Sequence, residues 1–152
     1  DVRDVIVASD ELIASAGYLA DRISVNLEQE NKIFEEQGVE AYEAYQVAHE
    51  NEILQKGAAF QLIKAFLELN NTELGRLVEV IIMSRNNANT CLRIFNSIQY
   101  YGLDITRATL TSGAEIAPYL KVFKTDLFLS ANSVDVQSAI NDGSCSRPYS
   151  YR

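Results

Sequence analysis

Apolar residues alternate between two kinds of pattern from residue 57 onward. Residues 77–83 (LVEVIIM) form a nearly continuous apolar run rich in β-branched residues, which predicts a buried parallel strand. Residues 88–101 carry apolar side chains at helical spacing before Gly102, which predicts an amphipathic helix. By the same criteria we predict further strands at 105–111 and 126–130, helices at 57–69, 116–123 and 133–141, and an edge strand within 144–151.

Strands that alternate with helices predict an α/β domain with a mostly parallel sheet flanked by helices. The first residues fit two patterns, because Val5–Ala8 could be a strand or the start of a helix that continues through Leu12, Ile13 and Leu19. Periodicity does not separate these two alternatives.

The charge of the chain is concentrated near its start. Residues 1–56 hold 13 acidic and 4 basic side chains, whereas the whole chain of 152 residues has a net charge of −8. We predict two helices in this acidic segment, Leu27–Gln37 and Val39–Glu50, broken at Gly38. Without a basic stripe, the chain is not expected to bind nucleic acid directly or to lie on an anionic membrane.

Cysteine and histidine are scarce. Cys91 and Cys145 have no metal-binding or disulfide-framework spacing, and His49 is the single histidine. No apolar run approaches the roughly 18 residues that cross a membrane. We therefore expect a reducing compartment, either the cytosol or an organelle matrix. The mitochondrial matrix is one option, because the chain starts at Asp1 without an initiator Met.

Ligands of parallel sheets lie beyond the carboxyl ends of the strands, where several polar residues are predicted to gather. Ser84 and Arg85 could bind a phosphate, and Lys121 could neutralise its charge. Asn132 and Asp135 could hold Mg²⁺ through oxygen atoms. Each residue also has a simpler role open to it, since Ser and Asn commonly cap helices and lysines are mostly solvated.

Several quoted stretches resemble one known family. The motifs HENE, MSRN, RIFNSI followed by YGLDITRA, and LFLSAN recur in this order in the cytosolic 5′-nucleotidase type I family. The resemblance covers about residues 27–143. It implies a fold of the haloacid dehalogenase-like (HAD) superfamily, and the family's enzymes remove phosphate from nucleoside monophosphates with Mg²⁺. The chain is then one HAD-like domain over 1–152, with a divergent segment 1–26 and a divergent tail 144–152.

The chain resembles the first half of such proteins, whereas the second half carries the nucleophilic aspartate in a DGDAV-type motif. No DxDx(T/V) sequence occurs in this chain. We align Gly17–Leu27 with the family's first strand, which places Asn26 where the acid would stand. An amide cannot form an aspartyl-phosphate.

The resemblance also assigns motif positions to the candidate residues. Ser84 corresponds to the second superfamily motif, Lys121 to the third, and Asn132 with Asp135 to the fourth. Thr111–Glu115 (TSGAE) departs from the family's TGG-x-SP loop, because it has one glycine in place of two and lacks the Ser-Pro.

We therefore expect a non-catalytic HAD-like domain that acts as a structural or interaction subunit, with protein partners and no cofactor. One alternative is an Mg²⁺-dependent phosphatase of AMP or IMP that uses Asp10 or Asp21 as the nucleophile. The other is a module that binds a nucleoside monophosphate through Ser84, Arg85 and Lys121 without turnover.

Overall fold

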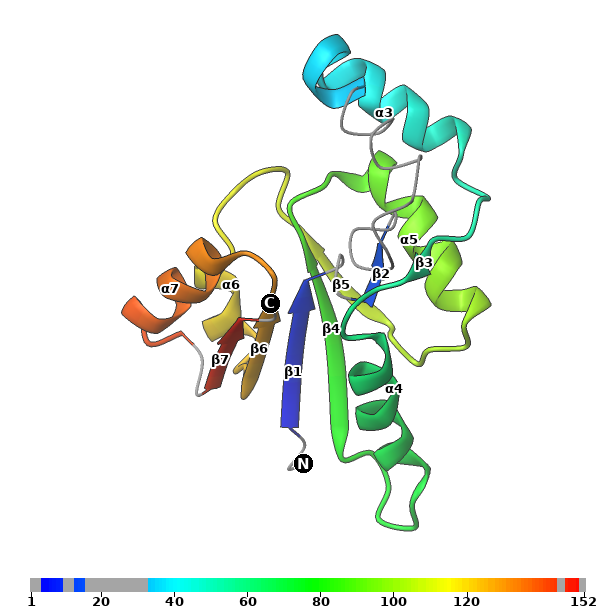
Figure 1. Ribbon diagram of the computed structural model, residues 1–152. Helices are drawn as coiled ribbons and strands as arrows, with labels where there is room; N and C mark the ends of the chain where they lie inside the picture. Colours follow the sequence, from blue (N-terminus) through cyan, green and yellow to red (C-terminus); the bar gives the residue numbers. More distant parts are fainter. Residues whose placement is uncertain (1–3, 10–12, 16–32, 145–146, 151–152) are drawn as a thin grey trace.

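The main sheet contains five parallel strands, and a computed structural model describes it within residues 4–9, 13–15, 33–144 and 147–150 (Figure 1). The order across the sheet is β5-β4-β1-β6-β7, and each neighbouring pair is parallel. The strands are β1 (Asp4–Ser9), β4 (Val78–Ser84), β5 (Arg107–Leu110), β6 (Leu127–Ser130) and β7 (Arg147–Ser150). The predicted α/β class with a parallel sheet is confirmed, and so is an edge strand in the tail.

The first residues form the central strand. β1 pairs with β4 from Asp4 opposite Val78 to Ser9 opposite Met83, and it pairs with β6 on its other side. Of the two alternatives that the sequence left open for Val5–Ala8, the strand is correct. A strand that has a neighbour on each side and helices on both faces is expected to consist of consecutive apolar residues. Accordingly, Ile6, Val7 and Ala8 are all buried.

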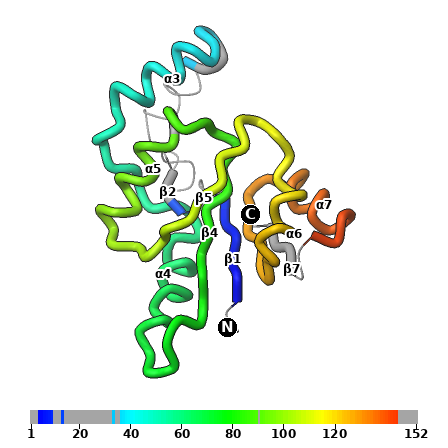
Figure 2. The backbone as a smooth tube through the Cα atoms, turned by 180° about the vertical axis from the view of Figure 1, so that it is seen from behind, coloured from blue at the N-terminus to red at the C-terminus, as the bar shows by residue number. Residues whose placement is uncertain are grey.

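Side chains of the sheet alternate between two apolar clusters. On one face, Ile6, Val80 and Ile82 pack with residues of α4 (Phe60–Glu68) and α5 (Ala88–Tyr100). On the opposite face, Val7 and Ile81 pack with residues of α6 (Ala117–Val122) and α7 (Ser133–Asn141). Figure 2 shows the same two groups of helices from behind. Covering both faces leaves the two ends of the strands as the places where polar side chains gather.

Most predicted elements are present with small changes of length. The helix predicted at 133–141 is α7, and the one predicted at 57–69 is α4 followed by a 3-10 turn, Leu69–Asn71. β5 has only four residues, because Ile105 N–H donates to the Leu103 carbonyl (2.8 Å) in a turn that precedes the strand. Among the described residues, no helix is long and apolar enough to cross a membrane.

The acidic segment forms a helix that projects beyond the carboxyl ends of the strands (Figure 1). A π-helical turn, Ile33–Gln37, changes to α3 (Gly38–Ala48) at Gly38, whose φ of +84° is easily adopted only by glycine. The predicted break at this residue is confirmed, while residues 27–32 lie outside the described part. A two-stranded antiparallel sheet pairs β2 (Ala14–Ser15), which precedes this segment in the chain, with β3 (Gln55–Lys56), which follows it.

Candidate functional site

Three neighbouring strands end in serine at the carboxyl edge of the sheet. Ser84 ends β4, Ser9 ends β1 and Ser130 ends β6, and all three are buried. The Ser84 hydroxyl accepts a hydrogen bond from Asn86 N–H, and the Ser130 hydroxyl accepts one from Asn132 N–H, each at 3.1 Å. The same turn therefore follows two strands that flank β1, and both turns lead into a helix.

Arg85 and Asp135 form an ion pair across the end of β1. Arg85 follows β4, whereas Asp135 lies in the first turn of α7 after β6, and β1 separates these two strands in the sheet. The Asp135 side chain is 7% exposed and that of Arg85 is 43% exposed. From the sequence we predicted that Arg85 binds a phosphate and that Asp135 binds a metal ion. In the structure these two side chains bind each other.

Asn132 caps helix α7. Its side-chain oxygen accepts hydrogen bonds from Val134 N–H (2.9 Å) and Asp135 N–H (3.3 Å). This is the capping role that the sequence offered as the simpler alternative. The cap also fixes the first turn of the helix, and thereby the position from which Asp135 reaches Arg85.

Lys121 lies away from the other candidates. It stands in the last turn of α6, and its ammonium group lies 3.5 Å from the Asp142 carboxylate at the end of α7. Both helices run from the carboxyl edge of the sheet toward the amino edge, so this pair lies at the opposite end from Ser84. A hydrogen bond from the Ser144 hydroxyl (2.6 Å), and then the charge of Lys121, lower the pKa of Asp142.

The loop after β5 is attached to the turn that carries Arg85. Gly113 N–H donates to the Arg85 carbonyl at 2.8 Å, and Ser112 N–H donates to the Asn86 carbonyl at 3.4 Å. Ser112 has a φ of +49°, a conformation that favours glycine, at the loop where the sequence has one glycine fewer than the family. Glu115 next to this loop is exposed.

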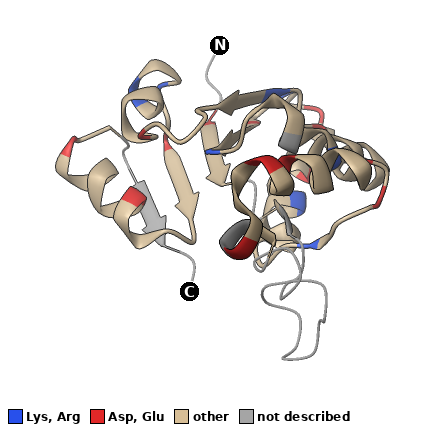
Figure 3. Ribbon diagram, turned by 90° about the horizontal axis from the view of Figure 1, so that it is seen from above, with Lys and Arg blue, Asp and Glu red and all other residues tan. Residues whose placement is uncertain are grey.

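Helix α3 is attached to the same edge through side chains. The Asn87 amide, two residues after Arg85, donates to the carboxylate of Glu43 in α3. Farther along α5, Arg93 Nε donates to the Glu52 carbonyl (2.9 Å) and the Asn96 amide donates to the Glu50 carbonyl (2.8 Å). Figure 3 views the molecule from above and colours the ribbon red at the positions of Asp and Glu. Part of the acidic segment therefore contacts α5 instead of being wholly solvated.

The position of β1 bears on the sequence alignment. β1 is the first strand of the described sheet and its centre, and Asp10 follows Ser9 in the sequence. The alignment of Gly17–Leu27 with the family's first strand, which places Asn26 at the acid position, falls on residues outside the described part. The two nucleophile candidates, Asp10 and Asp21, also lie outside it.

The sequence missed two features of this edge. Ser9 was not singled out, although the run VIVAS already suggested a strand that ends in a hydroxyl residue. The pairing of Arg85 with Asp135 was also missed, since it joins residues 50 positions apart and depends on strand order.

The described residues do not offer the donor set that Mg²⁺ takes. This ion needs near-octahedral oxygen coordination, yet the Asp135 carboxylate is paired with Arg85 and the Asn132 oxygen already accepts two backbone hydrogen bonds. Among the described residues, no three His, Cys, Asp or Glu side chains gather where they could hold a metal.

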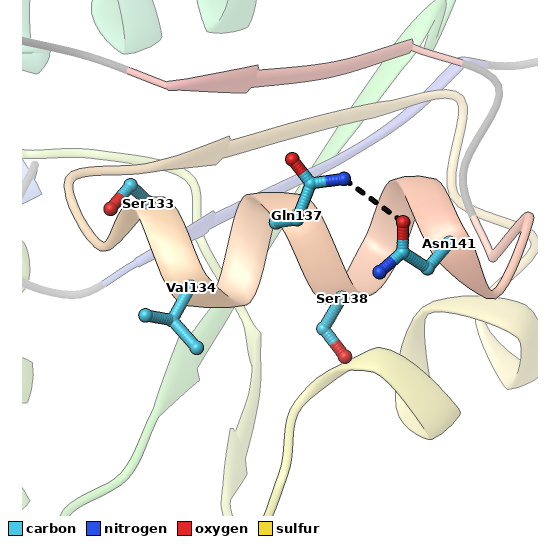
Figure 4. Close-up of a pocket in the computed structure, with 5 residues that line it drawn as sticks. All are labelled: Ser133, Val134, Gln137, Ser138 and Asn141. Carbon is cyan, nitrogen blue, oxygen red and sulfur yellow. Dashed lines mark hydrogen bonds between the residues drawn. The ribbon is translucent and has the colours of Figure 1, made fainter.

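A shallow hollow lies along the outer side of α7 (Figure 4). Its lining comes from this single helix: Ser133, Val134, Gln137, Ser138 and Asn141. The Gln137 amide donates to the Asn141 side-chain oxygen at 2.9 Å. The hollow lacks charged groups and is lined by one helix alone, so we do not include it in the candidate site.

Comparison with known proteins gives three matches. A family model described as 5′-nucleotidase matches residues 15–148. Human cytosolic 5′-nucleotidase 1B is 38% identical over 125 residues, covering 78% of this chain and 20% of that protein. The HAD domain of the Legionella pneumophila effector Lem4, solved as an inactive mutant, superposes with a TM-score of 0.54 at 14% identity, covering 100% of this chain and 87% of that one. The chain thus spans about a fifth of the human relative, and the structural match shows the HAD fold.

Proposed function

Since the chain belongs to the 5′-nucleotidase family, we propose that it is a HAD-like domain of that family without hydrolytic activity of its own, acting as a structural or interaction part of a larger assembly. The observation that carries this proposal is the ion pair of Arg85 with Asp135. The carboxylate at the position of the metal-binding motif has a guanidinium partner, so it cannot serve freely as a ligand.

The sequence after β1 supports the same proposal. The first motif that the resemblance implies, DxDx(T/V), has a second aspartate two residues after the first. In this chain Asp10 is followed by Glu11 and Leu12, so an apolar residue stands at the second position. A leucine side chain cannot give or take a proton.

A role in an assembly is supported by exposed apolar side chains on the helices of one face. Val122 on α6 is 76% exposed, and Val134 and Ile140 on α7 are 70% and 52% exposed. Burying such apolar side chains against another protein would be favourable, because it removes apolar surface from water. We also propose a reducing compartment, in line with the cytosolic relative and the scarcity of cysteine.

Phosphate release tests the absence of hydrolysis. The purified chain is incubated with AMP or IMP and Mg²⁺, beside an Asp10→Asn variant as a matched control. We expect the same background release from both proteins. Release by the unsubstituted chain that is lost in the variant would contradict the proposal.

The interaction role needs a separate measurement. We expect the native chain, cross-linked in the cell and fractionated by size, to elute with partner proteins. A monomer without partners would contradict this part of the proposal.

Hydrolysis of nucleoside monophosphates is the second candidate, and one observation favours it. The central strand β1 leads directly into Asp10 in the sequence, which is the order that a HAD nucleophile requires.

Binding of a nucleotide without turnover is distinguished from hydrolysis in the same experiment. A nucleotide that raises the melting temperature while no phosphate is released would assign the edge to binding, since a ligand at about 100 times its Kd adds roughly 2.7 kcal/mol.

A further inference from the structure

We infer that the Arg85 guanidinium takes the place of a divalent cation at the carboxyl edge of the sheet and keeps Mg²⁺ from binding there. This inference rests on the proposed function, because it gives a physical reason for the absence of metal-dependent hydrolysis. It concerns the occupancy of one carboxylate, and it can be tested without any nucleotide.

The sheet topology puts the cationic group at the switch point of the fold. The chain passes from β1 to β4 and β5 on one side and then returns to β6 and β7 on the other. Ligands of such sheets bind where the strand order reverses, next to the carboxyl end of the first strand. The guanidinium of Arg85 crosses that end to reach Asp135, and so it lies where a ligand's cation would be held.

Electrostatics favours the guanidinium at this position. Asp135 is almost fully buried, and a buried carboxylate requires a cationic or hydrogen-bonding partner. The guanidinium stays charged at every pH that the protein experiences, so its repulsion of a second cation is permanent. An Mg²⁺ ion would have to displace Arg85 and also take oxygen ligands that Asn132 gives to the helix backbone.

Arg85 is also held in place by its own backbone. Its carbonyl accepts the Gly113 N–H at 2.8 Å, and the adjacent Asn86 carbonyl accepts the Ser112 N–H at 3.4 Å. The turn is further closed by the Ser84 hydroxyl, which accepts the Asn86 N–H. Because the fixed backbone holds the guanidinium next to Asp135, its pairing costs no translational freedom, which favours the intramolecular cation over a diffusing one.

The test is an MgCl₂ titration of the full chain at constant ionic strength, followed by isothermal calorimetry and by the melting temperature. Arg85→Gln removes the charge while keeping a hydrogen-bonding group, and Arg85→Lys keeps the charge. We expect Arg85→Gln to bind Mg²⁺ at least about tenfold more tightly than the unsubstituted chain, and Arg85→Lys to bind like the unsubstituted chain. The double variant Arg85→Gln/Asp135→Asn should lose the gain.

Arg107→Gln is the matched control. Arg107 also pairs with a buried carboxylate, Glu79, at 2.9 Å, but Glu79 lies inside β4, away from the carboxyl edge. This variant should not gain Mg²⁺ binding, and a gain equal to that of Arg85→Gln would show that any released carboxylate suffices, which overturns the inference.

Two further results would overturn it. One is Mg²⁺ binding by the unsubstituted chain that Asp135→Asn abolishes, and the other is a folded Arg85→Gln variant without any gain. Because no nucleotide is present, these results are independent of phosphate release, which tests the proposed function separately. If Arg85→Gln does not fold, the comparison of the unsubstituted chain with Asp135→Asn still decides the question.

Discussion

The Asn70 side chain binds both polar groups of the Val78 backbone. Its oxygen accepts the Val78 N–H at 2.9 Å and its amide donates to the Val78 carbonyl at 2.8 Å. The same oxygen accepts the Leu77 N–H at 2.9 Å. One side chain in the 3-10 turn after α4 thus fixes the start of β4, the strand that leads to Arg85.

We therefore expect Asn70→Ala to destabilise the domain by about 2–3 kcal/mol, since three hydrogen bonds of roughly 1 kcal/mol each are lost. Urea unfolding followed by circular dichroism measures the change. The neighbouring Asn71 is exposed, and Asn71→Ala should stay within about 0.5 kcal/mol of the original protein. Equal midpoints for the two variants would contradict the role given to Asn70.

Ser112→Gly should stabilise the domain. Ser112 has a φ of +49°, which costs a non-glycine residue about 1–2 kcal/mol. Glycine also loses more backbone freedom on folding, by roughly 0.4–1 kcal/mol, so we expect a net gain of about 0.5 kcal/mol. Thermal unfolding compares this variant with Ser112→Ala, which retains the unfavourable φ and should show no gain. If both variants gained equally, backbone strain at residue 112 would not be the reason.

Arg107→Met should destabilise the domain by about 1.5–3 kcal/mol, because it removes a charge-assisted hydrogen bond to the buried Glu79 carboxylate. The double variant Glu79→Leu/Arg107→Met removes both charges and should recover most of this loss. Guanidinium unfolding of both proteins measures the difference. A double variant as unstable as Arg107→Met would instead attribute the loss to the packing of Arg107 over the Phe123 ring, whose centroid lies 5.2 Å away.

Asp142 should titrate below the ordinary aspartate pKa of about 3.9. The Ser144 hydroxyl is the largest single cause and the charge of Lys121 the next, so Ser144→Ala and Lys121→Ala should each raise the pKa of Asp142. A lowered folded-state pKa contributes stability that is present above the unfolded-state pKa and is lost as pH falls through the folded-state value. Carboxyl-carbon NMR titration measures the pKa, and an unchanged pKa in either variant would contradict the cause assigned to that residue.

Regular elements of the core could be predicted from sequence because their patterns are local. The apolar run that became β4 and the spacing that became α7 each depend on a few consecutive residues. The first strand was ambiguous because Val5–Ala8 is too short for its period to be distinguished. Only its pairing with β4 and β6 decides the matter, and both partners are far away in sequence.

The candidate site was predicted less completely than the fold. Ser84, Arg85, Asn132 and Asp135 were expected at one edge, and the structure brings them there, but Lys121 lies at the other. Lys121 lies in the last turn of α6, more than one helical turn away from the carboxyl edge. Similarity to a sequence motif does not indicate how far along a helix a side chain lies. The partner of each side chain could not be predicted from the sequence either. Charge alone does not indicate that Arg85 pairs with Asp135, the acid expected to bind a metal.

The parallel topology has a consequence for the order in which the protein becomes stable during synthesis. The N–H of Val5 donates to the Asp126 carboxylate at 2.9 Å, and these residues are 121 positions apart. At about 5–20 residues per second, the ribosome adds this stretch in on the order of 10 s. During that interval the apolar β1 has been made without its β6 neighbour, and only β4 is available to pair with it. The central strand is therefore made before both of its neighbours, and it gains the second of them only after β4 and β5 have followed it.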